Sequence, residues 1–230
     1  MKRVIAVLNQ KGGVGKTTST INLAAYLAKA GKTVLIVDLD PQGNASSGLG
    51  LDKHNLDTTM YDVLFNTGLT AIMDTAISGV SILPANSQLA AAEVDLAQED
   101  QREFKLRVAL QNLDFDYILI DCPPSLGLLS INALTAADNV LIPVQAEYYA
   151  MEGLSQLLDI VQRVRQGLNP DLQLLGVVVT MYDSRTALSE QVVQELKKHL
   201  GDKLMKTIIP RNVRLAEAPS FGRSILEHDK

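Results

Sequence analysis

The chain has 230 residues, 47% of them apolar and 20% charged, a composition that is typical of a folded globular protein and excludes a mainly disordered one. Aromatic residues make up only 4% and the single cysteine is Cys122, so neither a stacking platform for single-stranded nucleic acid nor a disulfide framework or cysteine-ligated cluster within one chain is expected. The net charge of −5 argues against a constitutive polyanion binder, although residues 185–230 hold nine basic and six acidic side chains, against twelve and twenty in the remainder.

Short aliphatic runs recur along the chain, and most are continuously apolar. Such runs are typical of parallel strands that are covered by helices on both faces. The predicted strands are Val4–Leu8, Thr33–Val37, Val80–Leu83, Tyr117–Ile120, Asn139–Val144, Leu174–Thr180 and Thr207–Ile209.

Between these runs lie segments whose apolar residues have helical spacing, and Gly31 stands where the first of them would end. The predicted helices are Lys16–Ala30, Ser87–Ala97, Arg102–Leu113, Ser125–Ala136, Gly153–Gly167 and Ala187–Leu200. Alternating strands and helices predict an α/β fold with a doubly wound, mostly parallel sheet and helices on both faces. We expect a single domain over residues 1–230, with short helices and loops in the irregular stretch 42–76.

A glycine-rich stretch follows the first predicted strand and opens the first predicted helix, which is the context of a phosphate-binding loop. Glycines let backbone N–H groups point at phosphate oxygens, and the helix start adds the positive end of its dipole. Lys16 would supply a cation to the β- and γ-phosphates, and the Thr17 hydroxyl suits Mg²⁺. The usual first glycine is replaced by Gln10, and a second lysine, Lys11, follows it. The expected nucleotide contacts are Lys11, Gly12, Gly13, Val14, Gly15, Lys16, Thr17 and Thr18.

Three aspartates follow strand-like runs. Asp121 ends an apolar strand beside the phosphate loop, where its carboxylate can hold Mg²⁺ through water, together with Thr17. Asp38 and Asp40 follow another buried run; such carboxylates are commonly solvated loop residues, but at the carboxyl edge of a parallel sheet they would face the ligand crevice. Adenine needs an apolar slot, and the candidates in and beside the loop Pro210–Val213 are Met181, Pro210 and Asn212.

The order Lys-Gly-Gly-x-Gly-Lys-Thr over Lys11–Thr17 is the deviant Walker A motif, and the chain resembles the ParA/MinD family of P-loop ATPases. Three further segments resemble the Soj-type chromosomal ParA proteins, which segregate bacterial DNA with a ParB partner: Val37–Asn44, Ile120–Ser125 and Ile209–Ser220. The resemblance covers essentially the whole chain. Family members usually continue past a segment such as Ser224–Asp229 into a final helix, so a helix beyond Lys230 stays an open alternative, of which the nucleotide site would be independent.

The resemblance implies ATP and Mg²⁺ as ligands and catalytic roles for Lys11, Lys16 and Asp40. Asp40 would orient the attacking water, with Asp38 supporting it. Lys11 would reach across to the phosphates of a partner subunit, so that ATP becomes part of a homodimer interface. Gly12 would lie where the two loops approach, and a side chain there would clash.

The resemblance also implies that Arg185 and Arg214, each in a loop after a strand, contact double-stranded DNA without sequence preference, although an arginine in such a loop is commonly just solvated. Further members of this basic patch would be Lys206, Arg211 and Arg223. An ATP-joined dimer doubles the patch, which reconciles an acidic protein with DNA binding. Slow hydrolysis, stimulated by a ParB-like partner, would release the protein from the nucleoid.

Other functions stay open from the sequence. A MinD-like membrane ATPase needs a C-terminal amphipathic helix, for which Ser224–Lys230 is too short and too charged; no run approaches the ~20 apolar residues of a membrane span, so we expect a cytoplasmic protein without membrane contact. A filament subunit would use ATP only for assembly, whereas Asp40 and Asp121 favour turnover. Cys122 is interpreted as a small apolar filler rather than a nucleophile, because the histidines stand isolated in polar surroundings: His54, His199 and His228.

Overall fold

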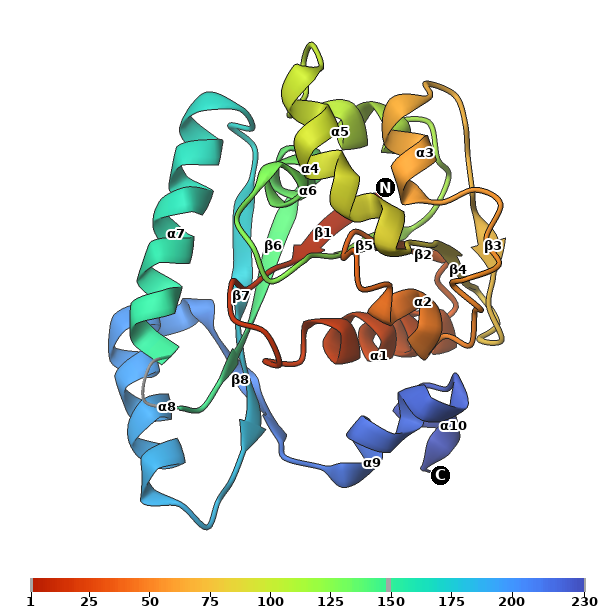
Figure 1. The fold of residues 1–230 in the computed structure, drawn as a ribbon. Coiled ribbons are helices and arrows are strands. Elements are labelled where there is room, and N and C mark those ends of the chain that lie inside the picture. Colours follow the sequence, from red (N-terminus) through yellow and green to blue (C-terminus); the bar gives the residue numbers. More distant parts are fainter. Residues whose placement is uncertain (1, 148–149, 230) are drawn as a thin grey trace.

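A computed structural model describes residues 2–147 and 150–229, and eight strands in these ranges form one continuous sheet (Figure 1). The strand order across the sheet is β3-β4-β2-β5-β1-β6-β7-β8. The strands are β1 (Arg3–Val7), β2 (Val34–Asp38), β3 (Met73–Asp74), β4 (Val80–Leu83), β5 (Tyr117–Asp121), β6 (Asn139–Gln145), β7 (Gln173–Tyr182) and β8 (Leu204–Pro210).

Neighbouring strands are parallel except at one edge, where the two-residue β3 pairs antiparallel with β4. The central strands β1, β2 and β5 are buried along almost their whole length, which is why their sequences are continuous apolar runs. In register, Asp121 at the end of β5 lies beside Val7 of β1 and Asp38 of β2. Polar side chains are thereby gathered at the carboxyl edge, where open α/β sheets bind their ligands. The predicted doubly wound, mostly parallel α/β fold is confirmed.

Helices cover both faces of the sheet (Figure 1). On one face, α1 and α2 belong to an apolar cluster that includes Ile21 and Val7; on the other, α3 to α8 contribute to a larger cluster that includes Leu134 and Leu157. No helix in the described part of the chain is both long and apolar enough to cross a membrane. The helices are α1 (Lys16–Lys29), α2 (Asn44–Gly48), α3 (Met60–Phe65), α4 (Ala92–Asp95), α5 (Lys105–Leu110), α6 (Leu128–Ala136), α7 (Ala150–Gly167), α8 (Ala187–Leu200), α9 (Val213–Glu217) and α10 (Ile225–His228), with 3-10 turns η1 (Ser87–Ala91), η2 (Leu96–Gln98), η3 (Gly201–Lys203) and η4 (Ala218–Phe221).

Two predicted helices differ from the structure in kind or in length, one being broken into short turns and the other being half as long as predicted, whereas the other predicted elements keep their type and agree within three residues at either end. The segment Ser87–Ala97 is broken into 3-10 turns around the single turn α4, from which Glu93 reaches the backbone at the start of α6 (2.7 Å). The segment Arg102–Leu113 is helical only over α5, because the Asn132 side chain binds the Arg102 carbonyl (2.7 Å) ahead of the helix. Tertiary contacts override local helix propensity at both places.

After β8 the chain returns beside α1 and α2 as α9, η4 and α10, which the sequence pattern does not predict (Figure 1). The Ile225 N–H donates to the Asn22 side chain of α1 at 2.7 Å, which ties α10 to that helix. A Cβ on Gly48 of α2 would lie 3.5 Å from Pro219 of η4. This return brings η4 to the edge of the sheet where the phosphate loop lies.

Candidate functional site

The phosphate loop joins β1 to α1. Gly13 and Gly15 have φ angles of 73° and 87°, in the left-handed region that glycine adopts without steric cost. Lys16 is buried, and its ammonium donates to the Lys11 carbonyl at 3.2 Å, which holds the cation against its own loop. Burial lowers the pKa of Lys16, because the desolvated ammonium loses its hydration; a bound phosphate would favour the charged form.

Two side chains that the sequence reasoning missed hold this loop from the core. The buried Thr180 hydroxyl, near the end of β7, donates to the Val14 carbonyl at 2.8 Å. The buried Asn9 side chain donates to the Pro143 carbonyl of β6 at 2.7 Å and accepts the Lys11 N–H at 2.9 Å. The available signal was a polar residue at the end of an apolar run, but its partner depends on the strand order.

Thr17 and Asp121 form a pair of oxygen donors below the loop. Thr17 Oγ1 donates to Asp121 Oδ2 at 2.7 Å, and the Thr20 hydroxyl lies 3.4 Å from the other carboxylate oxygen. Hydroxyl and carboxylate oxygens are ligands that suit Mg²⁺. No group of three or more His, Cys, Asp or Glu side chains in residues 2–147 and 150–229 could hold a metal by itself. The residues therefore fit a magnesium ion that also depends on phosphate oxygens.

Asp38 and Asp121 are fully buried at adjacent positions of β2 and β5. Burial raises the pKa of both carboxyls, and the charge of Asp38 raises the pKa of Asp121 further, while the hydrogen bonds from Ser46 and Thr17 oppose the rise. A cation at Asp121 would favour the ionised carboxylate. Asp38 accepts the N–H and the hydroxyl of Ser46 (2.8 and 2.7 Å), so it also anchors α2.

Asp40 is only 6% exposed and sits in a tight turn after β2. Its N–H donates to the Asp38 carboxylate (3.3 Å), and its own carboxylate accepts the Gln42 N–H (2.9 Å). The turn closes at Gly43, whose φ is 61° and whose Cβ, if it had one, would lie 2.6 Å from the Ala85 carbonyl oxygen. Asp38 thus lies where support for Asp40 was expected.

The loop faces a cavity of about 640 Å³, whose walls include Lys16, Thr17, Asp40, Met181, Pro219 and Ser220. A neighbouring apolar groove of about 870 Å³ shares Gly15, Thr18 and Met181 with this cavity and extends along Pro210 and Asn212. The expected adenine residues thus lie beside the phosphate cavity. Met181 has a φ of 51°, a strained conformation for a long side chain, and such strain is common at ligand sites. Sequence reasoning missed Pro219 and Ser220, because it predicted no structure after β8.

Lys11 and Gly12 lie at the outer part of the loop. The Lys11 ammonium pairs with Glu147 of the same chain, and both side chains are about half exposed (47% and 44%). A Cβ on Gly12 would meet nothing within 4 Å. Within one subunit a side chain at Gly12 therefore has room, so any clash there has to come from another molecule.

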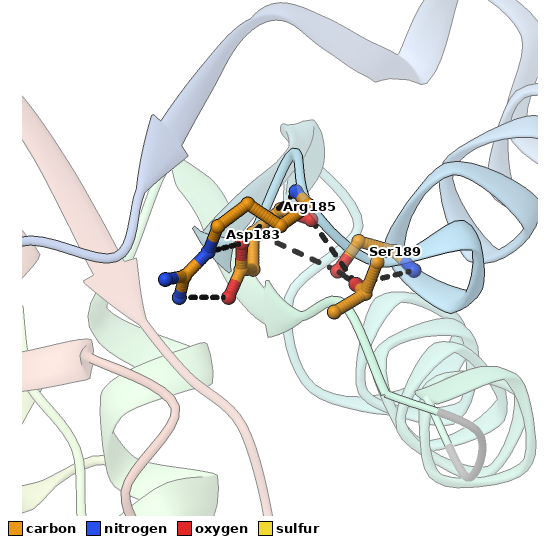
Figure 2. Close-up of polar contacts among 4 residues, drawn as sticks. Asp183, Arg185 and Ser189 are labelled. Carbon is orange, nitrogen blue, oxygen red and sulfur yellow. Dashed lines mark hydrogen bonds and ion pairs between the residues drawn. The ribbon is translucent and has the colours of Figure 1, made fainter.

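The two arginines expected at DNA are exposed, and each pairs with a nearby acid. Arg185 lies in the turn between β7 and α8 and makes a two-pronged ion pair with Asp183 (Figure 2). Arg214 was expected in a loop, and this is wrong: it lies in the short helix α9, which begins directly after the loop that follows β8, and its Nη1 lies 3.3 Å from a carboxylate oxygen of Glu217. The further basic residues expected in the patch are not buried either: Lys206, Arg211 and Arg223.

Cys122 is buried, and burial raises the pKa of its thiol well above the ordinary value, which makes it a poor nucleophile. One expectation about the histidines is wrong. His228 is not isolated in polar surroundings: its side chain is only 13% exposed, its ring stacks on Phe221 with 5.1 Å between centroids, and its Nε2 lies 3.8 Å from the Glu217 carboxylate. The fold of the last residues, which the sequence pattern did not predict, creates this contact.

P-loop ATPases have a glycine-rich loop between a central parallel strand and the helix that follows it, a buried lysine in that loop and an aspartate at the end of the neighbouring strand. This chain has the same arrangement and is a P-loop ATPase. Residues 2–174 match the family described as AAA domain. The sporulation initiation inhibitor protein Soj of Bacillus subtilis is 54% identical, with 100% of this chain and 92% of that protein covered, and the chromosome partitioning protein ParA of Myxococcus xanthus is 52% identical over 99% and 82%.

Solved structures agree. Cobyrinic acid a,c-diamide synthase of Mycobacterium smegmatis, with a bound ATP analogue and magnesium, is 42% identical, with a TM-score of 0.87 and with 99% of this chain and 96% of that chain covered. A plasmid partition protein of Borrelia burgdorferi bound to AMPPNP is 25% identical, with a TM-score of 0.84 and coverage of 100% and 96%. The chain belongs to the ParA/MinD family of deviant Walker A ATPases.

Proposed function

We propose that the protein is a DNA-partitioning ATPase. Two subunits joined by ATP bind double-stranded DNA without sequence preference, and slow hydrolysis, stimulated by a ParB-like partner, releases them. The cycle moves a chromosome or plasmid and keeps the protein on the nucleoid while ATP is bound. The names of its relatives, Soj and ParA, support partitioning as the process.

One observation carries the proposal: two strands beside the nucleotide site, β7 and β8, lead directly into the basic loops, by which we mean the turn of Arg185 and the loop-and-helix segment of Arg214. Near the end of β7, Thr180 binds the phosphate loop and Met181 lines both cavities. A few residues further on, the same strand leads into the exposed turn of Arg185, and β8 leads into the loop before Arg214. Nucleotide and DNA phosphates would therefore meet neighbouring parts of one surface.

The proposed chemistry assigns each residue a separate task. Lys16 and the N–H groups of the glycine loop bind the phosphates, and Thr17 with Asp121 would hold Mg²⁺, which when bound neutralises charge on the phosphates. Asp40 orients water toward the γ-phosphate; its near-complete burial and its turn hydrogen bonds fix its carboxylate. Positioning of this kind supplies most of the catalysis in phosphoryl transfer.

Assembly would complete the site. We propose that Lys11 leaves Glu147 and reaches the phosphates of the partner subunit, where a cation supplied from outside stabilises the charge that develops in the transition state. The open space around Gly12 fits a close approach by a second loop. Because the lone subunit lacks this lysine at its own γ-phosphate, its hydrolysis would be slow.

The likeness to the Mycobacterium smegmatis diamide synthase raises a second candidate, an amide-forming synthase. That reaction needs a pocket for a large acid substrate and a source of ammonia. Glutamine-dependent ammonia release uses a reactive nucleophile, and the one cysteine of this chain, Cys122, is buried with a raised thiol pKa. The exposed arginines at the nucleotide edge favour a phosphate polymer as the partner.

DNA binding under three nucleotide conditions tests the proposal. Fluorescence anisotropy of two labelled duplexes of unrelated sequence is measured with ATP, with ADP and without nucleotide. We expect similar binding to both duplexes with ATP and much weaker binding in the other two conditions. Equal binding in all three conditions, or no binding with ATP, would contradict it.

A further inference from the structure

In the turn between β7 and α8, Asp183 lies directly against Arg185, the arginine that is proposed to bind DNA (Figure 2). Asp183 accepts two hydrogen bonds from the guanidinium of Arg185, Nε to Oδ1 at 2.9 Å and Nη2 to Oδ2 at 2.7 Å. Both oxygens of the carboxylate are used, so the pair has the fork geometry that makes arginine–carboxylate contacts strong. The Arg185 side chain is nevertheless 83% exposed, so its outer edge is open to solvent.

Asp183 is held in place from its other side. Its carboxylate also accepts the Arg185 N–H at 3.0 Å, and its carbonyl accepts the Thr186 N–H and hydroxyl, both at 3.1 Å. Its own N–H donates to Ser189 Oγ at 3.4 Å at the start of α8. Pairing with Arg185 lowers the pKa of Asp183, with a further contribution from the charge of Arg211, which favours the ionised carboxylate. The acid is thus a fixed charge of the turn.

This pairing changes what Arg185 offers to a polyanion. A guanidinium has five N–H donors, and Asp183 occupies two of them, which leaves three for a phosphate. The phosphate would then sit next to an ionised carboxylate, and the pair as a whole carries no net charge. Arg214 differs, because it reaches its acid, Glu217, through one contact of 3.3 Å.

We propose that Asp183 competes with DNA phosphate for Arg185 and so limits the affinity of each subunit for DNA, which leaves strong binding to the ATP-joined dimer. The inference rests on the proposed function. The physical basis is that the counterions condensed on DNA are released when lysine and arginine side chains neutralise its phosphates, and this release drives binding. An arginine that a carboxylate already neutralises releases fewer of them. Weak binding by single subunits would let hydrolysis, which separates the dimer, also release the DNA.

The test compares variants at one turn by DNA binding with ATP over a salt series. Asp183→Asn removes the charge but keeps an oxygen that can accept the Arg185 N–H, so the turn is preserved. We expect Asp183→Asn to bind unrelated duplexes about 2- to 30-fold more tightly per dimer, since each exposed pair contributes little and the dimer contains two. The log–log salt slope should become steeper by up to about two units per dimer.

Two controls separate this effect from others. In the Arg185→Ala background, Asp183→Asn should lose most of its gain in affinity and slope, and only the smaller effect of the Asp183 charge on Arg211 should remain. Glu195→Gln removes the same charge from α8, where Glu195 pairs with Lys198 at 2.6 Å, and should leave the slope unchanged. ATP-dependent dimerisation of each variant is measured in parallel, and Asp183→Ser, which also keeps an acceptor oxygen in the turn, should repeat the gain.

The outcomes are distinguishable. If the wild type binds DNA with ATP and the affinity of Asp183→Asn is equal or lower, the role of Asp183 is overturned. The proposed function is not contradicted by that result. A gain that persists undiminished without Arg185, or that Glu195→Gln reproduces, also overturns the role of Asp183. If neither the wild type nor Asp183→Asn binds DNA with ATP, the proposed function fails and this inference fails with it.

Discussion

The nucleotide edge and the basic loops of this molecule are built in opposite ways. Several contacts that hold the phosphate site join residues far apart in sequence: Thr17 to Asp121 across 104 positions, Asn9 to Pro143 across 134 and Thr180 to Val14 across 166. The basic loops are held by neighbours, Arg185 by an acid two positions away and Arg214 by one three positions away.

These two kinds of contact make the nucleotide site rigid and leave the basic side chains free to change partners. Side chains fixed by distant strands cannot move without disturbing the core, which suits a site that must orient a phosphate and a water to within a fraction of an ångström. Side chains fixed by their own turn can exchange partners at small cost, which suits a surface that binds a polymer without a preferred register. Mutations at the first region should therefore have large, specific effects, and mutations at the second smaller ones that depend on salt.

Lys16→Ala should have the largest effect. Removing one partner of a desolvated charge contact costs roughly 2–5 kcal/mol, so ATP affinity should fall by about 30-fold to several thousandfold. Isothermal titration with ATP and Mg²⁺ measures it, with Lys11→Ala as the lysine control in the same loop. Unchanged affinity would mean that the cavity beside this lysine is not the ATP site.

Lys11→Ala should bind ATP almost normally while dimerisation and turnover are lost. The reason is that Lys11 is exposed and turned toward Glu147, outside its own phosphate cradle. By analogy with a cation supplied in trans, hydrolysis should fall about a thousandfold or to background. Light scattering with ATP, alongside a phosphate-release assay, follows both effects; a variant that dimerises like the wild type would show that the lysine does not act across the interface.

Asp40→Ala should bind ATP, form dimers and stall. Water positioning is lost while the contacts of bound ATP remain, so kcat should drop by about 100-fold or more with little change in KM. Gln42→Ala alters the same turn without removing the carboxylate and serves as the matched control. If Asp40→Ala hydrolyses ATP at the wild-type rate, Asp40 has no catalytic role and is only a carboxylate of the loop.

Arg185→Glu combined with Arg214→Glu should weaken DNA binding by at least about tenfold near 0.1 M salt and leave ATP-dependent dimerisation intact. Each reversal removes a cation and adds an anion, and a two-fold dimer counts the change twice. The milder variant Arg214→Ala should make the salt slope shallower by about one to two units per dimer, and Arg185→Ala should change the slope less, because Asp183 already neutralises part of that charge. DNA affinity equal to the wild type in the double reversal would exclude these loops from the DNA surface.

The same contrast explains what the sequence could and could not predict. The strands, the long helices and the phosphate loop follow from local patterns, and Lys16, Thr17 and Asp121 could be named because each ends or begins a recognisable element. The roles of Asn9 and Thr180 could not, because their partners depend on the order of β1, β6 and β7 in the sheet. The adjacency of Asp38 and Asp121 was missed for the same reason.

The C-terminal region shows the limit from the other side. The basic charge of this region was evident from composition, but the pairing of Arg185 with Asp183 was not predicted. The two residues are only two positions apart, yet sequence spacing alone does not distinguish a solvated arginine from one in a two-pronged ion pair. The turns after β8 were not predicted since they are short and packed on α1 and α2. Pro219 and Ser220 belong to the segment Ile209–Ser220 that carries the family resemblance, but their place in the wall of the nucleotide cavity was not predicted.

We propose that ATP joins two rigid nucleotide sites and thereby assembles the adaptable DNA surface. Size-exclusion chromatography with light scattering, run with ATP, with ADP and without nucleotide, each with and without a DNA duplex, tests it directly. We predict a dimer with ATP alone, a dimer that co-elutes with DNA when both are present, and a monomer separate from DNA in the other conditions. A monomer that co-elutes with DNA regardless of nucleotide, or an ATP-bound dimer that elutes separately from DNA, would contradict the assembly of the DNA surface by ATP.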